Sequence, residues 1–152
     1  MDLLRRSVSA VTLDKKSIIS SLTRVVESVL ASGEDSGEQE LRRLHDPKYA
    51  VYLIRKERQN IGYLAIHRGD VVTLQSLYIA SEWQRQGIGR CAFDFVAAFC
   101  REHGVSFFVC HCVPQNHNAR KFYERMGGVV IGEDFGNEES WQDSILYRFT
   151  LA

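Results

Sequence analysis

The chain has 152 residues, of which 45% are hydrophobic and 25% are charged, values that indicate a soluble globular protein rather than a disordered one. This length predicts a single domain over residues 1–152 that buries about 70% of its unfolded surface, so folding requires neither a metal nor a disulfide. Nineteen basic and nineteen acidic residues cancel, so no overall field attracts nucleic acid. No apolar run reaches the roughly 18 residues of a membrane span, and the first residues lack a signal-peptide pattern. We therefore expect a cytoplasmic protein whose four cysteines are reduced.

The first 45 residues are expected to form one strand and two helices. Residues 5–12 are β-prone but weakly patterned. Apolar residues from Ile18 to Leu30 follow a 3.6-residue period, which predicts a helix that ends at Gly33. A shorter helix is expected at 38–45.

From Tyr49 onward the hydrophobic period changes to two, which predicts strands at 49–56, 61–67 and 71–79 joined by hairpin turns. A helix then begins near Gly87, followed by a strand at 105–113, a helix at 116–126 and strands at 128–133 and 144–151. The apolar face of the helix after Gly87 is expected to comprise Ile88, Cys91, Ala92, Phe95, Val96 and Phe99. This order predicts a mixed α/β sheet with helices on both faces.

The clearest chemical signal lies between the strand that ends in Leu77-Tyr78-Ile79 and the helix that begins near Gly87. Free N–H groups at a helix N-terminus carry about half a positive charge and bind anions. Glycines at positions 87 and 89 remove side chains that would keep a diphosphate from the backbone. The spacing fits neither the mononucleotide nor the dinucleotide glycine pattern, and Gly-Ile-Gly alone is equally typical of a tight turn.

Two segments together resemble the GNAT family of N-acetyltransferases. The family pattern Arg/Gln-x-x-Gly-x-Gly/Ala is met by Gln84-Arg85-Gln86-Gly87-Ile88-Gly89, and the pattern Asn-x-x-Ala-x-x-Phe/Leu-Tyr-Glu-x-x-Gly is met by the segment from Asn116 to Gly127. The order of the elements also matches that family. The resemblance implies a GNAT-type fold, which is a mixed, mostly antiparallel sheet that splays between its fourth and fifth strands, here 71–79 and 106–113.

The resemblance further implies that acetyl-CoA is the acetyl donor. Backbone amides from Arg85 to Arg90 would cradle the pyrophosphate, the pantetheine would extend the strand that ends at Ile79, and the second motif would hold the cofactor near its thiol end. The residues assigned to the cofactor in this way are Leu77, Tyr78, Ile79, Gln84, Arg85, Gln86, Gly87, Ile88, Gly89, Arg90, Asn116, Ala119 and Phe122. Gln86 departs from relatives that carry Lys or Arg there, which removes one charge near the phosphates.

Tyr123 is the candidate acid. Acetyl transfer from a thioester requires a neutral amine, a donor for the oxyanion, which the amide near Ile79 could supply, and a proton for the departing thiolate. Tyr123 lies where the family places its usual catalytic tyrosine, and a phenol with a pKa of about 10 can donate that proton.

The candidate base is His111. Some relatives carry a Glu midway along the fourth strand, where this chain has Thr73 and Gln75. Relatives similar to the ribosomal-protein alanine acetyltransferase instead use a Glu at the position of His111, and an imidazole with a pKa near 6.5 can act there directly or through a water. Glu82 and a water chain remain alternatives. A metal site is not expected, because alternate strand residues place His111 opposite Cys110 and Cys112.

Nine of the nineteen acidic residues lie in two windows, 33–40 and 133–143, that contain no basic residue. In the family these loops border the acceptor, so we expect the acceptor to be a primary amine of a cationic small molecule, which attacks the thioester directly in a ternary complex. A lysine or N-terminus of a basic peptide is an alternative acceptor. A non-catalytic acyl-CoA-binding module is an alternative function. Phosphates of a tRNA acceptor would be repelled, and the sequence leaves a homodimer open.

Overall fold

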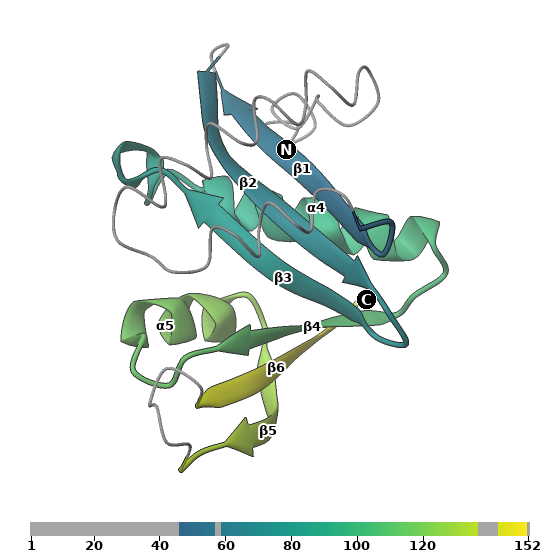
Figure 1. Cartoon of the computed structure of the whole chain (residues 1–152). Coiled ribbons are helices and arrows are strands. Elements are labelled where there is room, and N and C mark those ends of the chain that lie inside the picture. The colour runs from purple at the N-terminus through teal and green to yellow at the C-terminus, as the bar shows by residue number, and fades with distance from the viewer. Residues whose placement is uncertain (1–45, 57–58, 137–142, 152) are drawn as a thin grey trace.

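The computed structural model of the protein describes residues 46–56, 59–136 and 143–151, and every structural statement below concerns these ranges. They form one six-stranded sheet in the order β1-β2-β3-β4-β6-β5 (Figure 1). The strands are β1 (Tyr49–Lys56), β2 (Gln59–Arg68), β3 (Val72–Ile79), β4 (Phe107–Cys112), β5 (Val129–Asp134) and β6 (Ser144–Thr150). The helices are the short 3-10 turn η2 (Ser81–Trp83), α4 (Ile88–Glu102) and α5 (His117–Arg125).

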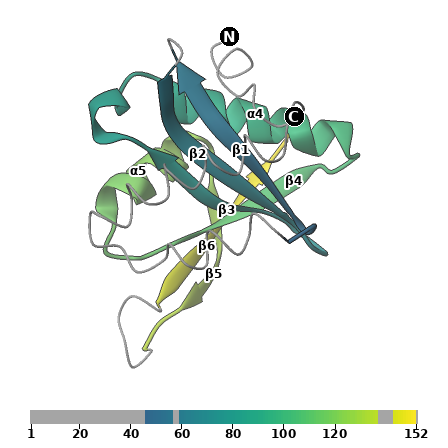
Figure 2. The ribbon, with the colours of Figure 1, turned by 45° about the horizontal axis from the view of Figure 1, so that its top comes forward.

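The first three strands form an antiparallel meander, as their alternating sequence predicts. The last three strands form a second group in which β6 pairs antiparallel with both β4 and β5. Figure 2 shows β6 and β5 at the edge of the sheet that lies farthest from β1. The prediction of a mixed, mostly antiparallel sheet is therefore confirmed.

The two groups meet along β3 and β4, which run parallel and pair at a single position, Thr73 with Val109. Beyond this point the strands separate toward their carboxyl ends (Figure 1). These are the fourth and fifth strands of the sequence-based numbering, so the predicted splay is present. Because the strands no longer pair, the edge of β3 that faces β4 keeps backbone groups available for a ligand.

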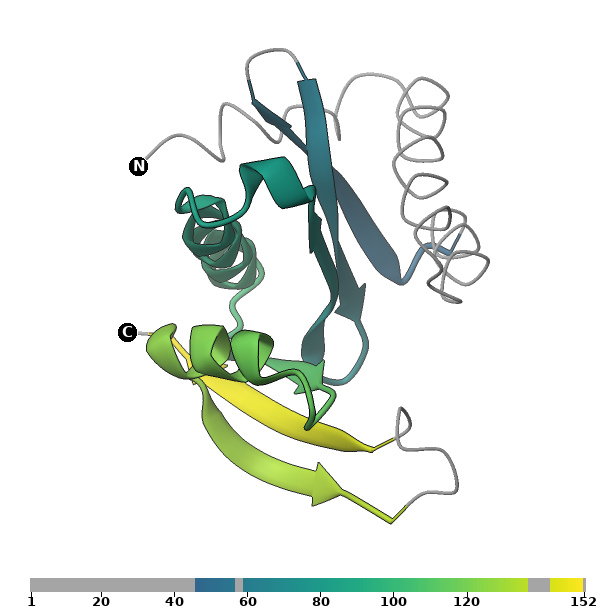
Figure 3. The ribbon, with the colours of Figure 1, turned by 90° about the vertical axis from the view of Figure 1, so that its left-hand side faces the viewer.

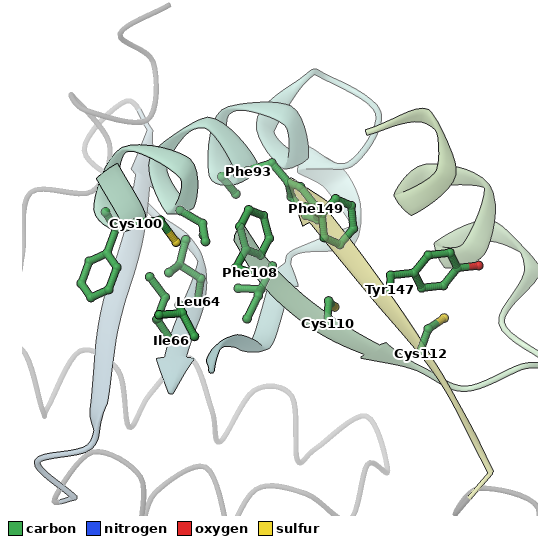
Figure 4. Packing of buried hydrophobic residues seen from close by; sticks show 14 of the residues in the cluster. Leu64, Ile66, Phe93, Cys100, Phe108, Cys110, Cys112, Tyr147 and Phe149 are labelled. Carbon is green, nitrogen blue, oxygen red and sulfur yellow. The ribbon is translucent and has the colours of Figure 1, made fainter. Parts of the chain in front are cut away.

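Helices α4 and α5 pack on the same side of the sheet (Figure 3). Phe93 of α4 holds this layer together, since its ring centroid lies 4.9 Å from that of Phe149 and 5.2 Å from that of Phe122 on α5. Phe108 stacks on Phe149 at 5.0 Å (Figure 4). The buried face of α4 comprises Ile88, Ala92, Phe93, Val96, Phe99 and Cys100.

This buried face differs from the predicted one. Phe93 and Cys100 are buried, whereas Cys91 and Phe95 are only partly covered. The buried face is rotated around the helix axis relative to the prediction, because α4 packs against α5 and β6 as well as against the meander. The strand expected at 5–12 and the helices expected before residue 46 lie outside the described residues. Within the described ranges, no helix combines the length and apolarity needed to span a membrane.

Candidate active site

The loop between β3 and α4 is held by the side-chain amides of two glutamines. Gln84 donates through Nε2 to the carbonyl oxygen of Ile79 at 2.9 Å, and Gln86 donates through Nε2 to the carbonyl of Glu82 at 3.1 Å. The first bond ties the loop to the end of β3, and the second closes the turn on itself. Two residues that the sequence assigned to the cofactor therefore also shape the backbone that would receive it.

The same loop adopts a left-handed backbone at two positions. Arg85 has a φ of 61°, and it is the one non-glycine residue with a positive φ in the described ranges, while Gly87 has a φ of 80°. Conformations of this kind carry a free-energy cost and concentrate at functional sites. Residues from Gln84 to Gly87 are exposed to solvent.

This conformation leaves a row of backbone donors without acceptors. In the described part of the chain, none of the N–H groups from Arg85 to Gly87 donates to a backbone oxygen. The N–H groups from Ile88 to Arg90 belong to the first turn of α4, which has no intrahelical acceptors, and Gly87 at the N-cap has no side chain to satisfy them. The loop thus presents the exposed amides that an anion requires.

Gly89 lies over Phe122. A Cβ added at Gly89 would lie 2.9 Å from Cζ of Phe122, so any side chain here would collide with the ring. The sequence explained this glycine by the approach of a phosphate alone. The structure adds that it allows α5 to pack beneath the first turn of α4, where Phe122 lies beside Gly89 and Phe93.

The carboxyl end of β3 points backbone groups toward β4. Ala80 donates its N–H to Ile61 of β2 at 2.8 Å. Because successive N–H groups of a strand point to opposite sides, the N–H and carbonyl groups of Leu77 and Ile79 point away from β2, and those of Tyr78 point toward it. Leu77 and Ile79 are therefore the residues of this strand that can bond a pantetheine arm through the backbone.

Asn116 is the N-cap of α5. Its side-chain oxygen Oδ1 accepts the backbone N–H of Ala119 at 3.1 Å. This contact explains the asparagine at the start of the motif, since its side chain satisfies a backbone N–H of the first turn of α5. The side-chain amide nitrogen of Asn116 is exposed and can still donate to a ligand.

Tyr123 on α5 is partly buried among aromatic rings, including Phe93 at 5.9 Å and Tyr147 at 5.6 Å between centroids. Tyr123 and Cys110 of β4 lie close enough for each side chain to affect the pKa of the other. Burial, and next the neighbouring Cys110, raise the pKa of Tyr123 well above its usual value. The phenol therefore keeps its proton throughout the neutral range.

His111 lies on the opposite face of β4. It is exposed and pairs in register with Leu146, whereas its neighbours Cys110 and Cys112 are buried toward α5. The structure therefore places the candidate acid and the candidate base on either side of the strand that borders the splay. Glu82 lies in the exposed turn before α4, where its carboxylate accepts from the hydroxyl of Ser81 at 3.4 Å.

The four cysteines are free thiols, and all but Cys91 are buried. Burial raises the pKa of Cys110 to about 12, so this thiol stays neutral. Among the described residues, no group of three or more His, Cys, Asp or Glu side chains is arranged to hold a metal ion.

The acidic windows are described only in part. Glu133 and Asp134 are exposed at the end of β5, and Asp143 is partly buried just before β6. The first window and residues 137–142 lie outside the described residues. Whether the two windows converge on one acceptor stays a prediction.

Sequence reasoning did not predict that Cys110 lies near Tyr123. One signal was available: alternation along β4 places Cys110 and Cys112 on the face away from His111, which is the face that α5 covers. The left-handed backbone at Arg85 offered no such signal, because arginine is not a residue that usually adopts it.

The sequence matches the model of the acetyltransferase (GNAT) family over residues 20–128. Among solved structures, an acetyltransferase from Thermus thermophilus is 24% identical, with a TM-score of 0.69 over 91% of this chain and 94% of that one. A GNAT family acetyltransferase from Elizabethkingia anophelis with acetyl-CoA bound is 17% identical, with a TM-score of 0.64 over 75% and 82%. Aminoglycoside 6'-acetyltransferase type Ii is 14% identical, with a TM-score of 0.75 over 91% and 94%. No curated protein is similar enough in sequence to count as a match.

At these identities the solved structures establish the fold, which is the one built above from the split sheet and the glycine loop. The family match covers most of the chain, including both motifs up to Gly128. The chain belongs to the acetyltransferase (GNAT) family and is an acyltransferase.

Proposed function

We propose that this protein is an acetyl-CoA-dependent N-acetyltransferase that moves the acetyl group to a primary amine by direct attack in a ternary complex. The observation that supports the proposal is the loop between β3 and α4, where the backbone amides from Arg85 to Arg90 have no backbone acceptor among the described residues, at the end of β3 beyond its single pairing with β4. A relative of the same fold binds acetyl-CoA. The amides from Arg85 to Arg90 would bind the diphosphate, and the backbone of Leu77 and Ile79 would bond the pantetheine.

The reaction follows from the groups around the splay. The neutral amine attacks the thioester carbonyl and forms a carbon–nitrogen bond, and the oxyanion that develops accepts the N–H of Ile79. Collapse breaks the carbon–sulfur bond, and the departing thiolate takes the proton of Tyr123. His111 would accept the one proton that the new ammonium loses, directly or through a water, and pass it through water to the Tyr123 phenolate. The net result is that one proton moves from nitrogen to sulfur.

The raised pKa of Tyr123 has two opposite effects on its role as the proton donor to the leaving thiolate. A phenol that stays protonated at neutral pH is always available as a donor, but it is a weak acid. The transfer to sulfur must therefore be coupled to return of a proton from the ammonium, so that a phenolate does not accumulate.

The acceptor class that the charges support is a cationic small molecule. Nine acidic residues in two windows, of which Glu133 and Asp134 are exposed beside β6, would attract and orient such an amine. A relative of the same fold is an aminoglycoside acetyltransferase. Reversing charge with Glu138→Lys and Glu139→Lys should raise KM several-fold for a cationic acceptor and leave KM for a neutral amine unchanged. If the charge reversal leaves KM for the cationic acceptor unchanged, the acidic residues do not steer the acceptor.

The experiment that tests the function is acetyl-CoA consumption across a set of cationic amines and basic peptides, with the wild type and Tyr123→Phe compared. An enzyme should acetylate at least one amine, and Tyr123→Phe should lower kcat by about 10²-fold while the Kd for CoA is unchanged. Turnover only with basic peptides would make it a protein acetyltransferase. CoA binding without turnover of any amine would make it a binding module.

A further inference from the structure

The edge strand β5 and the residue that follows it expose a group of apolar side chains. In the described ranges, six large hydrophobic side chains are exposed, and four of them lie close together in the chain, namely Val129, Val130, Ile131 and Phe135. Their exposed fractions run from 40% for Val130 to 64% for Val129. Single exposed apolar residues are ordinary, whereas a contiguous group is typical of a surface that contacts another molecule.

The backbone of β5 is also open on one side. This strand pairs with β6 and is the last strand of the sheet (Figure 2). Apart from that pairing, its backbone groups form no hydrogen bond with the backbone of another described residue. Neither α4 nor α5 lies over its outer edge (Figure 3). An unpaired strand edge of this kind is a template for another strand.

β5 lacks most of the features that keep an edge strand from pairing. Such strands usually carry a charged residue, a proline or a bulge. β5 has a bulge between Val130 and Gly132, but it has no charged residue or proline before Glu133. The bulge limits the stretch of backbone that can pair to a few residues, so the apolar side chains would supply most of the contact.

The charges at the two ends of β5 are opposite. Helix α5, which leads into β5, carries three Arg or Lys residues and one Glu, whereas β5 ends in the exposed acids Glu133 and Asp134. Antiparallel pairing of two copies brings the acidic end of each strand toward the basic helix of the other copy. The strand is therefore complementary to a second copy of itself, in the isologous arrangement that a two-fold axis requires.

We propose that β5 is a dimerisation surface, through which two copies of the protein pair antiparallel about a two-fold axis beside Val130. This register places Val130 opposite Val130 of the other copy and Val129 opposite Ile131, so apolar side chains contact apolar side chains. Glu133 then faces Gly127, next to the C-terminal end of α5. The inference concerns the assembly of the chain and does not depend on the function proposed above.

The mass of the full chain in solution tests the proposal. One copy has a mass of 17.4 kDa, and in sedimentation velocity we expect the mass to approach twice this value as the concentration rises. Val130→Lys should raise the dimer Kd about ten-fold or more, because each copy loses a buried valine and two lysines face each other across the axis. A wild type with the mass of one copy throughout, or an unchanged Kd in Val130→Lys, overturns the proposal.

Val71 supplies the matched control. Its side chain is 39% exposed, against 40% for Val130, but it lies just before β3 and outside the β5 surface. Val71→Lys should leave the dimer Kd at the wild-type value. Equal weakening of the dimer by both substitutions overturns the assignment to β5, since the added charge alone would then be responsible.

A cysteine at position 130 tests the register. Opposite residues of antiparallel strands have Cα atoms about 4.5–5.5 Å apart, within the range that a disulfide spans. Under mild oxidation, Val130→Cys should therefore form a disulfide-linked dimer on a non-reducing gel. Val71→Cys should not, and neither should the wild type, whose thiols are buried or partly buried.

Cross-linking that is no faster in Val130→Cys than in Val71→Cys overturns the pairing about Val130. Because a cysteine is a small apolar side chain, Val130→Cys disturbs the strand less than a lysine does. If Val130→Lys fails to fold by circular dichroism, the cysteine variants alone decide.

Discussion

The Cβ that a substitution would add at Gly89 lies 2.9 Å from the tip of the Phe122 ring. At Gly87 nothing lies within 4 Å of an added Cβ, and the constraint is instead the φ of +80°. The two glycines of the motif therefore serve different ends, although sequence reasoning assigned them a common one. Gly89 sets how closely α5 approaches α4, and Gly87 sets the turn that exposes the amides.

Gly89→Ala should destabilise the fold by about 1–3 kcal/mol through overpacking and should raise KM for acetyl-CoA, because Phe122 must move from beneath the diphosphate loop. Combining it with Phe122→Leu should restore much of both losses, since the shorter side chain leaves room for the methyl group. Thermal melts and initial rates measure the two effects.

Gly87→Ala is the control for this pair. Its cost should be about 1–2 kcal/mol from the left-handed backbone, and Phe122→Leu should not relieve it. Equal rescue of both alanine variants by Phe122→Leu would contradict the steric account of Gly89.

At the scale of elements, local pattern predicted most of the fold. The strand at 49–56 has the predicted bounds, and α4 begins one residue after Gly87, because alternation and helix-start glycines are local signals. The prediction of the buried face of α4 was wrong in part, because Phe93 packs against Phe122 and Phe149. These partners come from distant parts of the chain, which a periodicity within one helix cannot report.

In the candidate site, too, features within one helix were predictable from the sequence, whereas contacts between elements were not. Motif spacing correctly predicted that Asn116 begins α5 and that Tyr123 lies on the same helix. The packing of Tyr123 against Phe93 and the contact of Gly89 with Phe122 each join two elements. Such contacts depend on how helices settle on the sheet, and no spacing within a motif specifies them.

Asn116 has two expected roles, as the N-cap of α5 and as a hydrogen-bond donor to the cofactor, and substitutions can separate them. Asn116→Ala should lose about 1 kcal/mol of stability, because the N-cap acceptor of α5 is removed. Asn116→Asp should keep the stability, since a carboxylate also caps. It should nevertheless raise KM for acetyl-CoA several-fold, because the amide donor is lost and a negative charge faces an anionic cofactor.

Gln115→Glu is the control for charge, because it adds the same charge at the neighbouring position. A KM in Asn116→Asp no higher than in Gln115→Glu would mean that the amide nitrogen of Asn116 does not contact the cofactor.

At the scale of the whole molecule, the core buries three thiols whose pKa values are raised by desolvation, namely those of Cys100, Cys110 and Cys112. An unfolded thiol has a pKa near its ordinary value of 9.0, while burial raises the pKa of Cys110 in the fold to about 12. The stabilisation that this group contributes is therefore complete below pH 9 and is lost as the pH rises through 12.

The free energy of unfolding should accordingly fall as the pH is raised above 9. Cys110→Val should lessen this slope by up to about 1.4 kcal/mol per pH unit, because one ionising group has been removed. Chemical denaturation at a series of pH values from 7 to above 10 measures the slope. Identical slopes in the wild type and the variant would show that Cys110 is not desolvated in the folded state.

The central claim is that the amides from Arg85 to Arg90 bind the CoA diphosphate while the splay between β3 and β4 directs the sulfur toward Tyr123. A crystal structure of the protein with CoA tests it most directly. We predict diphosphate oxygens within hydrogen-bond distance of these amides, the pantetheine bonded to the backbone of Leu77 or Ile79, and the sulfur within reach of the Tyr123 hydroxyl. A diphosphate bound away from the loop, or a sulfur separated from Tyr123 by the core, would contradict the account.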